Sequence, residues 1–96
     1  MTSNPNYDRV ITMNKKLLKE FDKSIESYRT MEGYNYDEED RKEMSEVHES
    51  DAEDLREIYD LCSDDNFKEA YRNARHLDTL VRDLIPQGIW DIINPS

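Results

Sequence analysis

The sequence has little of what breaks, crosslinks or anchors a polypeptide chain. Its 96 residues include two glycines and three prolines, a scarcity that favours long uninterrupted helices over a strand-rich fold. The single cysteine, Cys62, cannot form an internal disulfide, so nothing indicates an oxidising compartment. No signal peptide is visible, and no apolar run approaches the ~20 residues that span a bilayer. These absences predict a soluble cytoplasmic protein, or one in the host cytoplasm if it is viral, that does not interact with membranes.

Apolar residues recur at steps of three and four along three stretches of the chain. This spacing predicts an all-α fold in one domain over 1–96: an antiparallel three-helix bundle with a short C-terminal helical cap. We expect helix one over about 7–30, helix two over about 38–62, helix three over about 65–85 and the cap over 89–93. The expected core residues are Leu18, Phe21, Ile25, Leu55, Ile58, Ala74, Leu77, Val81 and Trp90.

The expected connections between these helices contain residues that favour helix ends. Gly33 can adopt the left-handed conformation that ends the first helix, and Asp37 can cap the second. Ser63 or Asp65 is expected to begin the third helix. Pro86 ends it, because proline lacks the backbone N–H that a helix interior requires.

The negative charge of the chain lies almost entirely in one segment. The formal net charge is −10, whereas residues 37–65 contain 14 acidic and three basic residues, a net charge of −11. An acidic balance of this size disfavours direct binding to nucleic acid or to an anionic membrane surface. The only basic cluster that stands out is Lys15, Lys16, Lys19 and Lys23, which we expect to face the acidic helix within the molecule.

The acidic residues of the second helix are predicted to share one face. Steps of three or four residues place successive carboxylates about 5–6 Å apart along the helix axis. This is close to the ~6–7 Å between phosphates along one strand of nucleic acid. The predicted partner-binding residues are Glu39, Glu43, Glu46, Glu49, Glu53, Glu57, Asp60 and Asp64.

No catalytic or cofactor motif is present, so the sequence predicts neither an enzyme nor a cofactor. Cys62 lies on the apolar stripe and has no histidine near it in sequence, which favours core packing over nucleophilic work. His48 and Asp51 are spaced to hold a metal ion together. Because the chain has two histidines and one thiol, a closed zinc site is not expected, and we predict no metal site.

Two interpretations of the acidic face remain open. In the first, the protein is a stoichiometric nucleic-acid mimic that inhibits a nucleic-acid-binding or defence enzyme by occupying its basic groove. In the second, the protein is a structural or adaptor bundle, able to form a homodimer through Tyr34, Tyr36 or the start of helix two, and the acids only maintain solubility. Like charges at helical spacing cost about 0.2–0.5 kcal/mol per pair, which favours the first interpretation.

Small, acidic, helix-rich chains of this kind resemble, in general character, the inhibitors that phages and mobile elements use against host nucleic-acid enzymes. No motif carries this resemblance, and it assigns a role to no individual residue. What it implies is an anti-defence protein that acts through protein–protein interaction with a basic surface.

Overall fold

The computed structural model describes residues 13–94, and every regular element in that range is a helix. The described helices are α2 (Lys15–Arg29), α3 (Glu38–Ser63), α4 (Phe67–Ala74), α5 (Thr79–Arg82) and α6 (Gln87–Ile93). The predicted all-α class is therefore confirmed for the described residues. The predicted start of helix one, at residues 7–12, lies outside them.

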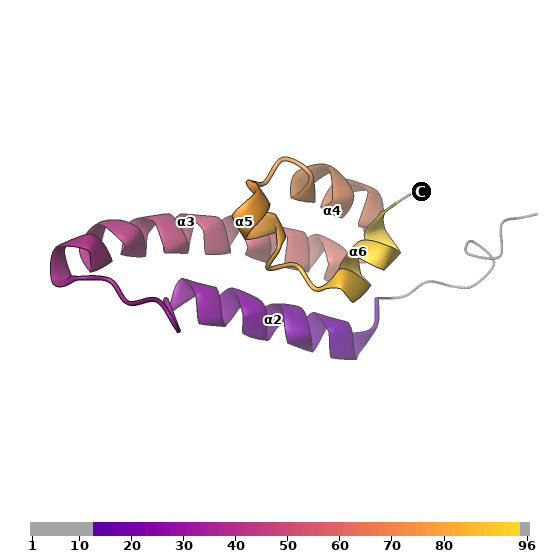
Figure 1. Cartoon of the computed structure of the whole chain (residues 1–96). Coiled ribbons are helices and arrows are strands. Elements are labelled where there is room, and N and C mark those ends of the chain that lie inside the picture. The colour runs from indigo at the N-terminus through magenta and orange to yellow at the C-terminus, as the bar shows by residue number, and fades with distance from the viewer. Residues whose placement is uncertain (1–12, 95–96) are drawn as a thin grey trace, which may run out of the picture.

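The helices α2 and α3 form an antiparallel pair along the length of the molecule (Figure 1). The three shorter helices lie against the C-terminal half of α3, where α4 packs on α3 and α6 contacts both α4 and α2 (Figure 1). Within residues 13–94, the N-terminal half of α3 lies beside α2 and the segment that joins α2 to α3, away from the three shorter helices (Figure 1). This uneven cover leaves one long side of α3 open.

The helix α2 begins at Lys15, later than the helix predicted over 7–30. Asn14 has extended backbone, and its Oδ1 accepts a hydrogen bond from the Lys16 N–H at 2.8 Å, which is the geometry of an N-cap. The N–H of Met13 donates to Oδ1 of Asp65 at 3.1 Å. This bond ties the entry of α2 to the connection that follows α3.

Two helices end on residues other than glycine in the left-handed conformation. Met31 (φ 58°) follows α2 and Asp65 (φ 60°) follows α3. The N–H groups of Glu32 and Asn66 then bond back to the carbonyls of Ser27 and Leu61, as in Schellman motifs.

These helix ends correct two expectations. The residue whose left-handed backbone ends α2 is Met31 rather than Gly33. Gly33 also has a positive φ, of 85°, but lies two residues further on. The N-cap of α4 is Asn66, because Asp65 belongs to the end of α3. Asp37 occupies the N-cap position of α3 as predicted, without a side-chain capping hydrogen bond.

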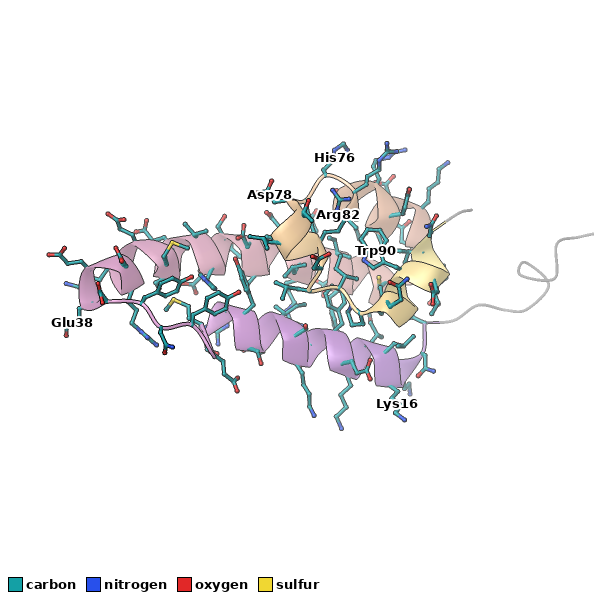
Figure 2. The ribbon with its side chains drawn as sticks, in the orientation of Figure 1. Lys16, Glu38, His76, Asp78, Arg82 and Trp90 are labelled. Atoms are coloured by element: carbon teal, nitrogen blue, oxygen red, sulfur yellow. The ribbon has the colours of Figure 1, made fainter. Side chains whose placement is uncertain are left out.

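The chain reverses at residues 75–78, where the sequence predicts one continuous helix over 65–85. The N–H groups of His76 and Leu77 bond three residues back, which tightens the end of α4. Asp78 then takes extended backbone as the N-cap of α5. Nη2 of Arg82 donates to the Leu77 carbonyl at 3.0 Å and so satisfies a backbone group that the break frees. Arg82 and Asp78 both lie at this turn in Figure 2.

The core lies between the C-terminal half of α3 and the helices around it. Phe21, Ile25, Leu55 and Ile58 are almost completely buried, as predicted, and so are Ala74 and Val81. Leu18, Leu77 and Trp90 are only partly buried and pack against this core.

The anchor of α6 differs from the prediction. Ile89 and Ile93 are the buried residues of this helix, whereas Trp90 packs edge-on against Tyr71 with the ring centroids 6.2 Å apart. A Cβ at Gly88 would lie 2.5 Å from the Leu17 Cδ2, so glycine allows α6 to approach α2 closely.

Candidate functional site

The acidic face of α3 is open to solvent along its whole length. All eight predicted partner-binding carboxylates, from Glu39 to Asp64, have exposed side chains. None of the eight forms an ion pair or a side-chain hydrogen bond with another described residue. Glu49 interacts electrostatically with Arg29, but no carboxylate of this face is held in an ion pair by a described residue.

The helical period explains why these residues share a face. The buried residues of α3 lie on the opposite side of the helix from the carboxylates. Between Glu39 and Asp64 the face extends for about 37 Å at 1.5 Å per residue. This length is close to the ~34–36 Å of one turn of B-DNA. The buried residues that face away from the acidic side are His48, Ala52, Leu55, Ile58 and Cys62.

The placement of acids at both ends of α3 costs helix stability at one of them. Glu38, Glu39 and Asp40 occupy the first turn, where the helix dipole favours negative charge. The last turn has no basic residue, and Asp60 lies there at the negative end of the dipole. An unfavourable charge of this kind costs about 0.3–1 kcal/mol. The acidic face therefore continues where helix stability alone would place a base.

Of the four lysines of α2, Lys16 and Lys23 lie on the side opposite the buried stripe of that helix, whereas Lys15 and Lys19 line a hollow beside Tyr59 of α3. Lys15, Lys16, Lys19 and Lys23 are exposed, and none forms an ion pair with a described residue. Figure 2 shows Lys16 directed away from α3. The expectation that these lysines face the acidic helix holds only in part: Lys15 and Lys19 lie beside Tyr59 of α3, but none of the four forms an ion pair with a described residue of α3.

In the ion pairs that join α2 and α3, the basic residue is on α3 and the acidic residues are on α2, the reverse of the expected pairing. Arg56 of the acidic helix reaches Asp22 at 2.9 Å and Glu26 at 3.3 Å, both on the basic helix. Its guanidinium also lies 4.9 Å from the centre of the Tyr59 ring. The pKa of Glu26 is lowered, mainly by its hydrogen bond to Arg29. These pairs join the helices without neutralising the acidic face.

A buried histidine, His48, organises the end of the molecule where α3 begins. Its side chain is 1% exposed, and Nδ1 lies 2.7 Å from the Tyr28 backbone carbonyl. Because a carbonyl only accepts hydrogen bonds, Nδ1 donates. Nε2 lies 3.0 Å from the Tyr36 hydroxyl, which can donate to it in the Nδ1–H tautomer. The ring of Tyr28 stacks on His48 at 4.1 Å, and that of Tyr34 meets it edge-on at 4.8 Å.

The same cluster fixes Asp51 in a structural role. The Tyr28 hydroxyl donates to Oδ2 of Asp51 at 2.7 Å. Burial raises the pKa of Tyr28 above its usual value, and the bond to Asp51 raises it further. Sequence spacing alone indicates His48 and Asp51 only as a metal pair. The signal it missed was a histidine at helical spacing with Ala52 and Leu55 on the buried stripe.

Other features of the described residues give no catalytic arrangement. No group of three or more His, Cys, Asp or Glu side chains among residues 13–94 is arranged to hold a metal ion. A shallow hollow of about 220 Å³ between α2 and α3 is lined by Leu18, Tyr59 and three charged residues, and it is smaller than the ~300–1,000 Å³ of typical ligand pockets. Burial raises the pKa of the Cys62 thiol to about 11, which disfavours the reactive thiolate. None of the described helices is both long and apolar enough to span a bilayer.

Comparison with known proteins adds no relative. No protein-family model, curated protein or solved structure matches this chain. The acidic face, its length and the absence of ion pairs to its carboxylates among the described residues are therefore the observations on which a proposal of function depends.

Proposed function

We propose that the protein binds a basic partner stoichiometrically through the acidic face of α3, as a nucleic-acid mimic that inhibits a nucleic-acid-binding or defence enzyme. The observation that carries this proposal is the row of eight exposed carboxylates without ion pairs among the described residues. A groove that holds nucleic acid presents Lys and Arg to phosphates, and carboxylates at similar spacing meet the same donors.

The separation of charge in the molecule supports the proposal. The lysines of α2 form no ion pair with the acidic face among the described residues. A face of one sign attracts a partner of the opposite sign and accelerates association, most strongly at low salt. Carboxylates are retained at the C-terminal end of α3 against the helix dipole. That cost is understandable if the negative potential of the face is what matters.

An adaptor bundle that self-associates is the second candidate, and one observation favours it. The side chain of Tyr34 is 42% exposed in the segment that joins α2 to α3. Tyr36, by contrast, is half-buried and its hydroxyl bonds to His48. A dimer whose stability is insensitive to salt and is lost in Tyr34→Ser would favour this candidate over the mimic.

Competition with nucleic acid tests the proposal. The immobilised protein is incubated with a nuclease-treated bacterial lysate, and the captured proteins are then challenged with duplex DNA or with salt of matched ionic strength. We expect DNA to release a basic protein more effectively than the salt, and the free inhibitor to block that protein's nucleic-acid activity at a one-to-one ratio. A captured partner that holds DNA and this protein at the same time would contradict the mimic mechanism.

A further inference from the structure

Val47 is an exposed apolar residue on the flank of α3, beside the acidic face. Its side chain is 45% exposed, whereas Ile58, which lies on the same flank eleven residues later, is 1% exposed. The flank of α3 that carries both residues is therefore buried near Ile58 and exposed near Val47. The change coincides with the edge of the layer formed by α4, α5 and α6 (Figure 1).

The short length of α4 explains the open flank. Eight residues of α4 extend for about 12 Å, compared with about 39 Å for the 26 residues of α3. A continuous helix over 65–85 would have covered about 30 Å of that length. Because the helical run breaks at residues 75–78, no helix among residues 13–94 covers the flank around Val47.

The neighbours of Val47 on the helix surface are mostly acidic. Asp40, Glu43 and Asp54 lie seven residues before, four before and seven after it, and all three are exposed without ion pairs to described residues. Met44, three residues before Val47, is partly buried. We name Met44 and Val47 with these three carboxylates the Val47 patch. An apolar centre with a polar rim is the general arrangement of a protein–protein interface.

We infer that the Val47 patch binds a basic amphipathic helix of a partner protein, whose apolar side chain contacts Val47 while its Lys or Arg residues meet the carboxylate rim. This inference rests on the proposed function and specifies the partner's surface. Nucleic acid does not fit, because the rim repels phosphate. A second copy of the chain, placed symmetrically on this patch, would bring together two rims of the same sign.

The apolar contact and the carboxylates are expected to contribute in different ways. Carboxylates at a rim increase the association rate and lose their effect as salt rises. A buried apolar contact slows dissociation and is insensitive to salt. The Val47 patch therefore makes the protein prefer partners that carry an apolar stripe. The acidic face alone has no such preference.

Two synthetic helical peptides test the inference. Both have the same length and the same lysines; one contains only Lys and Ala, and the other carries Leu along a single stripe. Affinities are measured by fluorescence anisotropy at low and moderate salt for the wild type, Val47→Ser and the control Leu80→Ser. Leu80 is a suitable control because it is 83% exposed on α5, outside the patch.

We expect the wild type to bind the Leu-striped peptide about 5–10-fold more tightly than the Lys/Ala peptide, the effect of burying one aliphatic contact. Val47→Ser should abolish this preference and leave the affinity for the Lys/Ala peptide unchanged, and Leu80→Ser should alter neither. A preference that survives in Val47→Ser, equal binding of both peptides by the wild type, or dimerisation that requires Val47 would overturn the inference. Equal binding would leave the proposed function intact, whereas failure to bind either peptide at low salt would count against both.

Discussion

The two halves of α3 are held in the molecule by different forces. The C-terminal half places Leu55, Ile58 and Cys62 in an aliphatic core beneath α2 and the three short helices. The N-terminal half is attached through His48, which bonds to Tyr28 and Tyr36. Burial of aliphatic groups is non-directional and contributes most of the stability, whereas hydrogen bonds fix one geometry and contribute about 1 kcal/mol each. The comparison indicates that stability is concentrated at one end, while the acidic face extends over both.

Truncation of the aliphatic core should have the largest effect. Leu55→Ala removes a fully buried side chain and should lower the free energy of unfolding by about 2–5 kcal/mol, because it loses both the transfer free energy and the packing around a new cavity. Urea unfolding followed by circular dichroism measures this change. A loss below 1 kcal/mol would mean that the core at this end is not the main source of stability.

Replacement of His48 should have a smaller and more local effect. His48→Phe retains a ring for stacking but removes the hydrogen bonds to the Tyr36 hydroxyl and to the Tyr28 carbonyl, which keeps its bond from the Met31 N–H, at a cost of about 1–3 kcal/mol. Amide hydrogen exchange should accelerate in residues 31–50 and remain unchanged near Leu55. Equal acceleration along all of α3 would show that its two halves unfold as one unit and would remove the distinction drawn here.

Alkaline pH should lower the free energy of unfolding at both ends of the molecule, through Cys62 in the aliphatic core and through Tyr28 beside His48. The pKa of Cys62 is raised by burial from 9.0 to about 11, and that of Tyr28 is raised above 10. The folded state therefore holds both protons more tightly than the unfolded state, and its stability is lost as pH rises, from about 9 to 11 for the thiol and from about 10 upward for the phenol. The urea midpoint should fall over this range. The fall should be shallower in Cys62→Ala between pH 9 and 11, and shallower in Tyr28→Phe above pH 10; a parallel fall in all three proteins would contradict these assignments.

Added salt should have the smallest effect and a positive sign. The carboxylates of the acidic face repel one another without ion pairs among the described residues, so screening should raise the melting temperature, by roughly 4–8 °C for each 1 kcal/mol relieved. The exposed Arg56 pairs oppose this change, but surface ion pairs contribute only about 0–1 kcal/mol. A melting temperature that falls between low and moderate ionic strength would show that these pairs outweigh the repulsion.

Periodicity in the sequence was sufficient to predict the aliphatic end. Phe21, Ile25, Leu55 and Ile58 recur at helical spacing, and burial follows from that spacing alone. The break at residues 75–78 could not be found in this way, because the apolar repeat from Phe67 to Leu84 continues through it. What ends α4 is local: the N-cap at Asp78 and the hydrogen bond from Arg82 to the backbone.

The polar end could not be predicted because its residues come from three separate segments. His48 is on α3, Tyr28 is on α2, and Tyr36 lies in the segment between them, so only the folded chain brings them together. The acidic residues were found from the sequence because helical spacing alone places them on one face. Their use in binding remains a prediction, since spacing defines a charged surface but not what contacts it.

The ionic-strength dependence of binding to the captured partner tests the central claim most directly. Two variants that each alter four charges are compared with the wild type: Glu43, Glu46, Glu53 and Glu57 to Gln on the acidic face, and Lys15, Lys16, Lys19 and Lys23 to Gln on α2. Both sets of residues are exposed, so we expect each variant to fold. Circular dichroism checks this before binding is measured.

The account predicts that wild-type affinity falls steeply as salt increases, and that the Glu variant binds at least about 100-fold more weakly at low salt with a flatter dependence, since each lost contact is worth about 1 kcal/mol or more. The Lys variant should bind as tightly as the wild type. A folded Glu variant with full affinity and an unchanged salt dependence would contradict the claim that the acidic face of α3 is the binding surface.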